Sequence, residues 1–292
     1  MKKITIIGGN SALAKYLIQT LSPGNKVISQ GRKYCDFYCN LQDDVESIVI
    51  HDSPDVVICT AAAFNGKTDQ EIVQTEDVNA IGTLKICIAA KRANVKHLIL
   101  ISSQSAILKE NSLYYGIYSL SKRHAEELAT YYCSMNHLPL TILRPSQIYD
   151  AKGEFRKHQP LIYLIADNAE IGKDITIYGS NDALRNCIYI EDLIEIINRV
   201  IERRCEGIYS CTNISDIRLS DIAKAAQCAF NAGGKILFLK DKIDIPNTIS
   251  ENKPDLYEKI GFFPKTDIVE GRKKIAKYRM MVSNEKYNCQ WS

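Results

Sequence analysis

The stretch from Ile6 to Leu17, "IIGGNSALAKYL", closes an apolar run with two adjacent glycines and opens a segment of helical periodicity. In an α/β chain that binds a dinucleotide, the first strand-to-helix turn brings backbone N–H groups to the pyrophosphate. A G-x-x-G-x-x-G spacing falls here on Gly8, Ser11 and Ala14. The stretch therefore predicts such a turn with its first glycine kept, and the alternative is a tight turn in another α/β protein.

The two replaced glycines change this turn to different degrees. Ala14 is a mild change, because this position serves helix-strand packing and alanine is an accepted variant there. Ser11 places a Cβ where the backbone approaches phosphate, but its hydroxyl offers a hydrogen-bond donor in exchange. We expect dinucleotide binding to be weakened and retained.

Apolar, β-rich runs alternate with helical segments on both sides of the turn. The runs are "KITIIGG", "KVISQ", "PDVVICTAAA", "KHLILISS" and "PLTILRP", and the helical segments are 11–21, about 70–93 and 118–135. This alternation predicts an α/β fold, a Rossmann-like doubly wound parallel sheet covered on both faces. We assign residues 1–149 plus about 187–213 to the dinucleotide-binding domain, and 150–186 plus 214–292 to a smaller C-terminal substrate-binding lobe.

Composition restricts the partners. A net charge of +3 over 292 residues favours neither nucleic acid nor a membrane surface. The apolar run Ile4 to Ile7 is too short for a secretion signal, and no run approaches the roughly 18 residues of a membrane span, so we expect a cytoplasmic protein. The ten cysteines are scattered singly, which predicts reduced core residues. Cys35 and Cys39 are close, but they lack further ligands at metal spacing, so no metal is expected.

The second apolar run bears on the choice of cofactor. NAD-binding chains place an acid about 20 residues after the glycines to hold the ribose, whereas arginine there accommodates the 2'-phosphate of NADP. The sequence "VISQGRK" has Gln30 at that place, followed by Arg32 and Lys33. It favours NADP, with NAD as the alternative cofactor and a solvated basic turn as the alternative explanation.

The segment "LILISSQSAILKENSLYYGIYSLSKRHAEELA" contains the candidate chemistry. Tyr118 and Lys122 lie four apart in a helical context and so share one face. We expect the ammonium to lower the pKa of the phenol from about 10. Ser103, at the end of the preceding strand, offers a hydroxyl to the same substrate oxygen. Together these residues suit hydride transfer at a carbon that bears a hydroxyl or carbonyl.

Two alternatives remain for these residues. Tyr118 can be a core tyrosine beside an exposed lysine. A one-residue slip would move the role of Ser103 to Ser102, Gln104 or Ser105.

Several motifs together resemble the extended short-chain dehydrogenase/reductase family, also called the NAD-dependent epimerase/dehydratase family, over nearly the whole chain. They are "YSLSKRHAEELA", "TAAA" at 60–63, "VNAIGTLKI" with its structural Asn79, "ILRPSQIYD", and "ITIYGSNDALRNCIYIEDL". The resemblance implies a nucleotide-linked hexose, or its 4-keto derivative, as substrate.

The resemblance also implies roles for individual residues. Arg185 is expected to face the substrate diphosphate, and its alternative is a surface arginine in a salt bridge. Gln147 stands near the substrate in place of an asparagine. Asn40 replaces an aspartate that points at the adenine, while Asp150 and Asn186 replace a glycine and an aspartate. Gln147 and Asn186 retain amide polarity, so we expect altered substrate selection, whereas Asn40 keeps an acceptor but loses charge.

The predicted site residues fall into three groups. The catalytic residues are Ser103, Tyr118 and Lys122. The cofactor contacts are Gly8, Asn10, Ser11, Ala12, Leu13, Arg32, Asn40, Leu41, Ala61, Ala62, Tyr118, Lys122 and Pro145. The substrate contacts are Ser103, Gln147 and Arg185.

These expectations point to an NADPH-dependent reductase of a nucleotide-activated 4-keto (deoxy)hexose. The alternatives are an epimerase with retained NAD(P) and a non-catalytic regulator that senses NADP. A dehydratase is disfavoured because such members resemble Asp-Glu after the catalytic hydroxyl residue, where this chain has Gln104-Ser105. A stripe of Ile81, Leu84 and Ile88 predicts a homodimer through a helix bundle, and its alternative is packing on the sheet.

Overall fold

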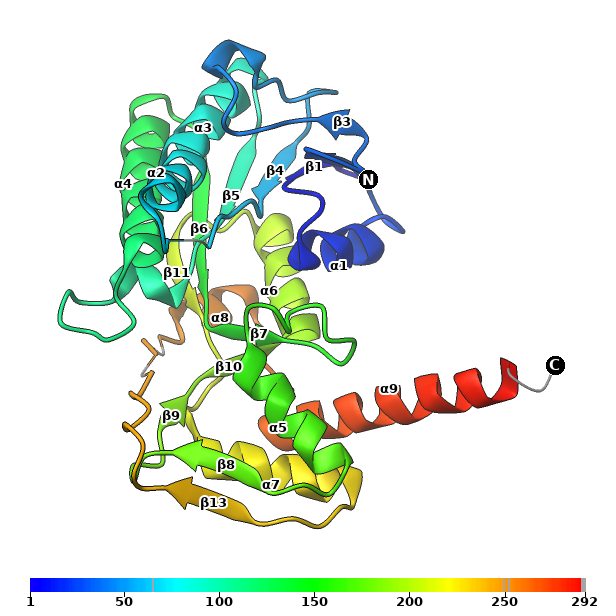
Figure 1. Cartoon of the computed structure of the whole chain (residues 1–292). Helices are drawn as coiled ribbons and strands as arrows, with labels where there is room; N and C mark the ends of the chain where they lie inside the picture. Colours follow the sequence, from blue (N-terminus) through cyan, green and yellow to red (C-terminus); the bar gives the residue numbers. More distant parts are fainter. Residues whose placement is uncertain (65, 249, 252, 290–292) are drawn as a thin grey trace. The chain divides into compact units, whose positions relative to one another are not determined.

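The computed structural model describes residues 1–64, 66–248, 250–251 and 253–289 (Figure 1). The chain forms two compact units. The first comprises Met1–Pro145, Ile194–Cys211 and Lys253–Phe262, and the second comprises Ser146–Leu193, Thr212–Asn252 and Phe263–Ser292.

A seven-stranded sheet, parallel throughout, forms the centre of the first unit. Its order is β11-β6-β5-β4-β1-β2-β3. The strands are β1 (Lys3–Ile7), β2 (Lys26–Gly31), β3 (Phe37–Tyr38), β4 (Val56–Cys59), β5 (His97–Ile101), β6 (Leu140–Pro145) and β11 (Gly207–Cys211). The predicted doubly wound parallel sheet is confirmed, and the strand order reverses between β1 and β4, where such folds bind ligands.

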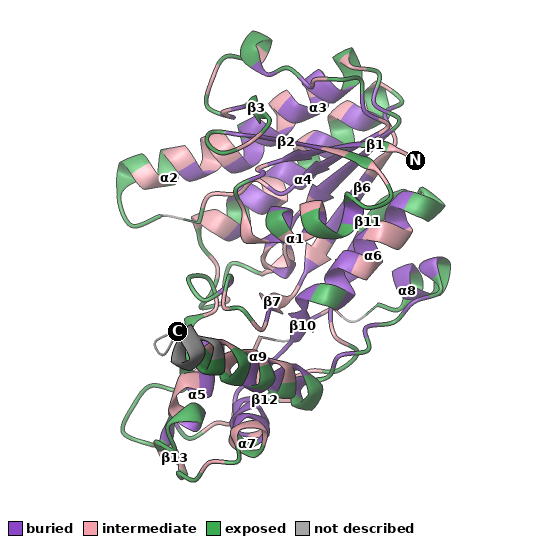
Figure 2. Ribbon diagram, turned by 90° about the vertical axis from the view of Figure 1, so that its right-hand side faces the viewer, coloured by how far each residue is buried: buried purple, intermediate pink, exposed green. Residues whose placement is uncertain are grey.

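Helices cover both faces of this sheet because its strands are apolar on both sides (Figures 1 and 2). On one face lie α3 (Gly82–Arg92) and α4 (Ile117–Met135), and on the other α1 (Ala12–Leu21) and α6 (Ile190–Arg203). The expected helix at about 70–93 is interrupted: α2 (Asp69–Glu76) leads through a π-helical turn, Asp77–Ile81, into α3. The short helix α8 (Asp255–Ile260) also belongs to this unit.

The strand register brings the ends of several strands to one edge. Ile7 pairs with both Gln30 and Cys59, and Cys59 pairs with Leu100. The residues that follow β1, β2, β4 and β5 therefore gather at the carboxyl edge of the sheet.

The described cysteines are free, and most of them are core residues as predicted. Cys39, Cys59, Cys87, Cys133, Cys187 and Cys211 are buried, whereas Cys228 is exposed. Burial raises the pKa of the Cys39 thiol to about 12 and also raises the pKa of Cys59.

The second unit is built from short paired strands and three helices. The strand pairs are β7 (Gln147–Tyr149) with β10 (Cys187–Tyr189), β9 (Leu184–Arg185) with β12 (Ile217–Arg218), and β8 (Ile175–Tyr178) with β13 (Ile236–Leu239). The helices are α5 (Pro160–Glu170), α7 (Leu219–Phe230) and α9 (Ile268–Cys289).

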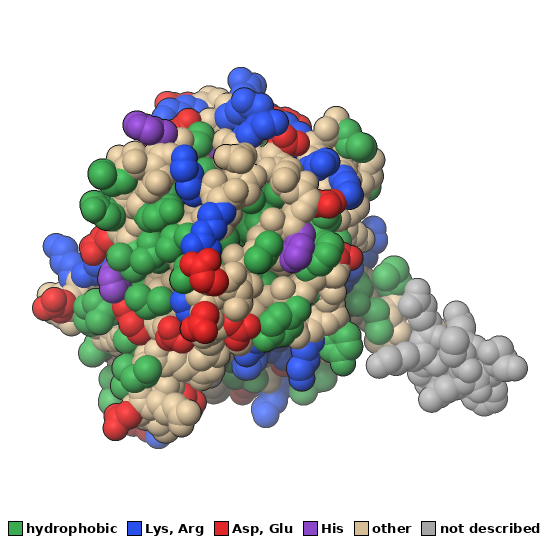
Figure 3. Space-filling model, turned by 90° about the horizontal axis from the view of Figure 1, so that it is seen from above, with side chains coloured by type: hydrophobic (Ala, Val, Ile, Leu, Met, Phe, Trp, Pro, Cys, Tyr) green, Lys and Arg blue, Asp and Glu red, His purple; other side chains and the backbone are tan. Residues whose placement is uncertain are grey.

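Figure 3 shows Lys and Arg side chains interspersed with Asp and Glu on the face seen from above. This mixture agrees with the small net charge of the chain. Among the described residues, no helix is both long enough and apolar enough to cross a membrane.

Arg272 of α9 is a fully buried cation in the second unit. Its Nη1 donates to the Ile162 carbonyl at 2.8 Å, but within the described ranges its Nε and Nη2 have no hydrogen-bond partner. Its guanidinium carbon lies 5.9 Å from the centre of the Tyr149 ring, and burial lowers the pKa of Arg272. An apolar side chain of similar length would remove this desolvation cost.

We therefore expect Arg272→Met to stabilise the chain, by on the order of 2 kcal/mol. The urea midpoint of unfolding measures this change, with the exposed Arg218→Met as the control substitution. A lower midpoint for Arg272→Met would mean that the guanidinium contributes net stability.

His97 is a buried imidazole at the amino end of β5. Burial, together with the nearby charges of Lys2 and Arg204, lowers the pKa of His97 to about 4. The unfolded chain titrates near 6.5, so the neutral imidazole stabilises the fold above pH 6.5, and this stability is lost as the pH falls toward 4. The loss amounts to about 3 kcal/mol.

We expect the free energy of unfolding of the wild type to fall more steeply between neutral pH and pH ~4.5 than that of His97→Gln. Urea unfolding of both proteins at the two pH values measures the difference, and the shared carboxylates cancel. The same pH dependence of the free energy of unfolding in the wild type and in His97→Gln would contradict a lowered pKa for His97.

Candidate active site

The glycine turn after β1 is shaped by close backbone approach. Gly8 has a φ of 82°, and a Cβ there would lie 2.7 Å from the Ala61 nitrogen. A Cβ on Gly9 would lie 2.9 Å from the Ser29 Cβ and from the Cys35 Sγ. Both glycines are therefore required by their neighbours, independently of any ligand.

The N–H groups available to a phosphate lie just beyond these glycines. Gly8 and Gly9 donate to the Gln30 carbonyl at 2.8 and 3.1 Å, so their N–H groups belong to the sheet edge. Ala12 and Leu13 open α1, and N–H groups of a first helical turn have no intrahelical acceptor. The start of α1 therefore suits a pyrophosphate, and Asn10 leads into it.

Ser11 differs from its expected role. Its Oγ accepts from the Ala14 N–H at 3.1 Å and so caps α1. The same oxygen lies 2.9 Å from the Thr60 hydroxyl, which itself donates to the carbonyls of Ile7 and Gly8. The Ser11 proton is therefore used on Thr60, and the expectation that this hydroxyl serves as a free donor to phosphate is corrected.

The end of β2 also differs from the sequence interpretation. Gln30 is fully buried, and its side chain donates to the Val49 carbonyl at 2.8 Å, away from the turn. Gly31 lies beside the turn instead, since a Cβ there would be 3.0 Å from the Asn10 Oδ1. The residue of β2 that borders the turn therefore has no side chain, and the exposed Arg32 follows it.

The other predicted cofactor residues lie in the same unit. Ala61 and Ala62 follow β4, and Ala61 touches the glycine turn. Asn40 is committed to its own loop, donating to Asp43 Oδ1 at 2.8 Å and accepting weakly from the Gln42 N–H at 3.4 Å. Leu41 is buried, and Pro145 ends β6.

The three predicted catalytic residues lie at the carboxyl edge of the sheet and on α4. Ser103 follows β5, and its Oγ accepts from the Ser105 N–H at 3.0 Å. Tyr118 and Lys122 lie on α4, and the Lys122 ammonium donates to the Ile101 carbonyl at 3.0 Å. The Tyr118 ring stacks on Phe64 with 4.8 Å between ring centres. Sequence spacing and structure agree in grouping these residues.

The proton affinity of Tyr118 differs from the expectation. Burial raises the pKa of Tyr118 to about 12, and a hydrogen bond with the Ser103 hydroxyl opposes the rise. Burial also lowers the pKa of Lys122, whose ammonium is held by the Ile101 carbonyl. The predicted lowering of the phenol pKa by Lys122 is therefore wrong for this structure. At neutral pH the phenol is protonated, which is the form that donates a proton.

Asn79 in the π-helical turn ties the loop after β4 to α4. Its side chain accepts from the Ala63 N–H at 2.8 Å, donates to the Ala63 carbonyl at 2.9 Å, and donates to the Ser121 hydroxyl at 2.9 Å. Ser121 in turn donates to the Tyr118 carbonyl at 3.1 Å. A π-helical turn allows one buried side chain to reach both elements.

A buried ion pair joins α4 and β6 and contacts Ser102, the residue before the predicted catalytic Ser103. Glu126, one turn beyond Lys122, accepts from Arg144 Nε at 2.9 Å and Nη2 at 2.5 Å, and from the Ser102 hydroxyl at 2.5 Å. Gln104 donates to the Arg144 carbonyl at 3.0 Å. The residues on both sides of Ser103 are thus anchored to α4 and β6, which fixes the position of its hydroxyl. Sequence reasoning did not identify this network.

Two of the predicted substrate residues, Gln147 and Arg185, lie in the second unit, whereas Ser103 lies in the first. Arg185 is buried, and its Nη1 donates to the carbonyls of Leu184 and Pro246, each at 2.7 Å. Because Arg185 is only 4% exposed, the alternative of a surface arginine is wrong. Gln147 lies on β7, where the Cys187 thiol points at its Oε1 at 3.8 Å.

Two of the replaced family positions are structural. The Asn186 side chain bonds the backbone of Asn213 and the Asp216 carboxylate. Asp150 is fully buried, accepts from the Tyr163 hydroxyl, and accepts from the Lys152 N–H at 3.1 Å.

Comparison with known proteins agrees with this geometry. Residues 4–212 match the NAD dependent epimerase/dehydratase family. Protein CapI from Staphylococcus aureus is 24% identical over 265 residues, covering 80% of this chain and 78% of CapI. UDP-glucose 4-epimerase from Thermotoga maritima, solved with UDP-glucose, has a TM-score of 0.79 at 20% identity and covers 96% of this chain and 99% of that one. RMD from Pseudomonas aeruginosa, complexed with NADPH, has a TM-score of 0.79 at 14% identity, covering 95% and 98%.

The chain belongs to the NAD-dependent epimerase/dehydratase family. It is an enzyme of the extended short-chain dehydrogenase/reductase type, as its motifs predict. The residues present fit a nicotinamide dinucleotide, because the turn at Gly8 and Gly9 leads directly to the N–H groups of Ala12 and Leu13 at the start of α1.

Proposed function

We propose that the chain is an NADPH-dependent reductase of a nucleotide-activated 4-keto (deoxy)hexose. The observation that carries the choice of reductant is at the end of β2. Gly31 carries no side chain beside Asn10, and the exposed Arg32 and Lys33 follow. An acid there would repel a 2'-phosphate, whereas a guanidinium binds it.

The side chains at the carboxyl edge of the sheet suit the proposed reaction. The nicotinamide, when bound, supplies the hydride that reaches the ketone carbon. Ser103 polarises the carbonyl oxygen by donating a hydrogen bond, and Tyr118 gives its phenolic proton to that oxygen. A pKa of about 12 in the structure keeps this proton on Tyr118 until charge develops on the substrate. Lys122 binds the ribose of the cofactor.

A panel of nucleotide-linked 4-keto-6-deoxyhexoses, each incubated with NADPH or NADH, tests the proposal by the loss of reduced-nicotinamide absorbance. We expect NADPH to be oxidised faster, and Arg32→Ala to weaken NADPH selectively. Turnover of NADH alone would overturn the assignment of the reductant.

The second candidate is an epimerase with retained NAD(P). The likeness to UDP-glucose 4-epimerase in fold favours it. An epimerase returns the hydride it takes, so purified protein would carry tightly bound NAD and convert a UDP-hexose without net oxidation. Cofactor extraction from the purified chain separates the two candidates. A non-catalytic regulator would show no turnover above that of Tyr118→Phe.

We also propose a homodimer through α2, α3 and α4. Helix α2 exposes Val73 at 67%, α4 exposes Tyr131 at 69% and Met135 at 66%, and the π-helical turn before α3 exposes Ile81 at 37%. Apolar side chains gathered on neighbouring helices are typical of subunit contacts. Sedimentation equilibrium measures the oligomeric state.

A further inference from the structure

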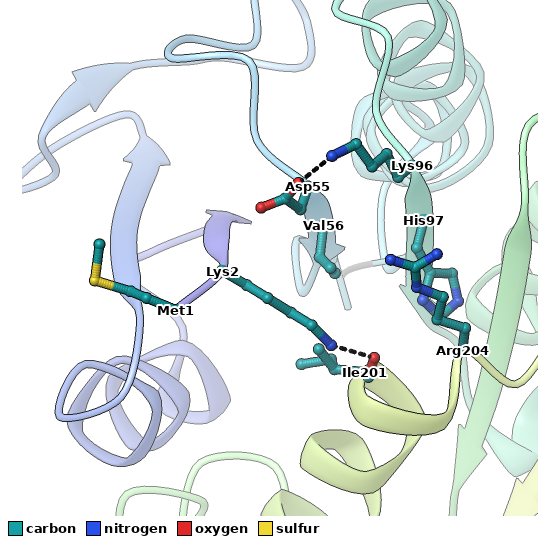
Figure 4. A pocket seen from close by; sticks show the side chains of 8 residues that line it. All are labelled: Met1, Lys2, Asp55, Val56, Lys96, His97, Ile201 and Arg204. Atoms are coloured by element: carbon teal, nitrogen blue, oxygen red, sulfur yellow. Dashed lines mark hydrogen bonds and ion pairs between the residues drawn. The ribbon is translucent and has the colours of Figure 1, made fainter.

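A polar cavity lies at the opposite edge of the sheet from the predicted catalytic residues. Its volume is about 230 Å³, room for several water molecules, and Figure 4 shows the side chains that line it. His97 begins β5, Val56 begins β4, and Ile201 belongs to the last turn of α6. The cavity is therefore at the amino ends of the strands, whereas Gly8 and Ser103 follow their carboxyl ends.

Positive charge exceeds negative charge around this cavity. Lys2, Lys96 and Arg204 line it together with one carboxylate, Asp55. Lys96 is paired with that carboxylate at 2.6 Å, and the Lys2 ammonium donates to the Ile201 carbonyl at 2.8 Å. Lys2 and Arg204 both lie close enough to His97 to act on its charge. An ammonium and a guanidinium are thus left without a carboxylate in the cavity lining.

His97 adds a buried acceptor to these cations. It is 2% exposed, and its Nε2 lies 2.7 Å from the Thr141 hydroxyl. That hydroxyl donates its only proton to the Cys205 carbonyl, so Nε2 must carry the ring proton and donate. The Nδ1 lone pair is then an acceptor, and among the described residues it has no partner. Leaving such an atom buried and unpaired is costly.

We propose that this cavity binds a phosphate ion that keeps one proton. The phosphate oxygens accept from Arg204 and Lys2, and the remaining P–OH donates to His97 Nδ1. A fully ionised oxyanion satisfies the cations but presents another acceptor to the Nδ1 lone pair. Inorganic phosphate supplies both kinds of group at neutral pH, whereas sulfate supplies only acceptors.

Titration calorimetry of the full chain at pH ~7.5 with inorganic phosphate, methyl phosphate and sulfate tests the proposal. A phosphomonoester loses its last proton near pH ~6, so methyl phosphate resembles sulfate under these conditions. We expect inorganic phosphate to bind at least about tenfold more tightly than either, since a buried hydrogen bond is at stake. Equal affinity for the three anions would overturn the proton contact. If methyl phosphate bound more tightly than inorganic phosphate, free phosphate would not be the ligand of this cavity.

Two variants locate the binding. Arg204→Gln is expected to weaken phosphate by about tenfold or more. Arg203→Gln removes the same charge one residue earlier, outside the cavity lining, and should leave phosphate binding unchanged. Phosphate held at the glycine turn would survive Arg204→Gln and so overturn the assignment. The His97 ring signals in a ¹H–¹⁵N spectrum of the wild type should also shift on addition of phosphate.

This experiment is independent of the proposed reductase activity. NADPH oxidation by Arg204→Gln should match the wild type, because the substitution lies at the other edge of the sheet. If Arg204→Gln loses phosphate binding and keeps the wild-type rate of NADPH oxidation, the phosphate site is separate from the active site. If the wild type oxidises no NADPH, the measured phosphate affinities remain valid.

Discussion

We expect Tyr118→Phe to lower kcat by about 10²- to 10⁴-fold, the usual contribution of a positioned proton donor. The substitution removes the phenolic proton and its hydrogen bond with Ser103 while keeping the ring that stacks on Phe64. The fold and the NADPH affinity should therefore stay close to those of the wild type. Stopped-flow measurement of NADPH oxidation, with a separate fluorescence titration of NADPH, gives both quantities.

Tyr131→Phe is the matched control for this prediction. It removes one hydroxyl from the same helix, where the side chain is 69% exposed. We expect kcat to be unchanged. If Tyr118→Phe kept the wild-type rate, another group would be the proton donor.

Arg144→Met destabilises the first unit by about 3–5 kcal/mol, because it leaves the Glu126 carboxylate buried without its cation. Glu126 is 5% exposed, and the ion pair is bidentate, so solvent cannot replace the guanidinium. Urea unfolding measures the loss. The Ser102 hydroxyl, which donates to the same carboxylate, cannot compensate a full charge.

The double variant Arg144→Met/Glu126→Leu separates the cost of an unpaired charge from the value of the pair. Removing both ions should restore most of the stability, since apolar replacements of a buried pair are often neutral. If the network also positions Ser103, kcat of the double variant stays low although its stability recovers. Equal instability of the single and double variants would contradict the ion-pair explanation.

The periodic parts of the fold were predictable from the sequence. Buried strands in a parallel sheet read as continuous apolar runs, so β1, β4 and β5 stand out without any knowledge of their neighbours. The four-residue spacing of Tyr118 and Lys122 likewise fixes a shared helix face. The break in the helix at Asp77–Ile81 was not predictable, because a π-helical turn depends on the tertiary partners of Asn79.

The details of the site depended on contacts between elements. Spacing along α4 gives no sign that Lys122 donates to Ile101 on the preceding strand β5, or that burial raises the pKa of Tyr118. Whether Gln30 or Gly31 faces the glycine turn depends on strand register, and a one-residue shift exchanges the two faces. The prediction that the Ser11 hydroxyl is a free donor also depended on a contact between elements. Thr60, the residue after β4, lies within hydrogen-bond distance of that hydroxyl.

The buried cysteines can report local unfolding of the chain without any engineered label. Alkylating reagents attack the thiolate, so a protonated thiol in the core reacts only after its segment opens to solvent. Cys59 on β4 and Cys187 on β10 belong to different compact units, and burial raises the pKa of each, for Cys187 to about 12. Alkylation rates at Cys59 and Cys187, measured by mass spectrometry, would give the local opening rates of the large sheet and of the second unit separately.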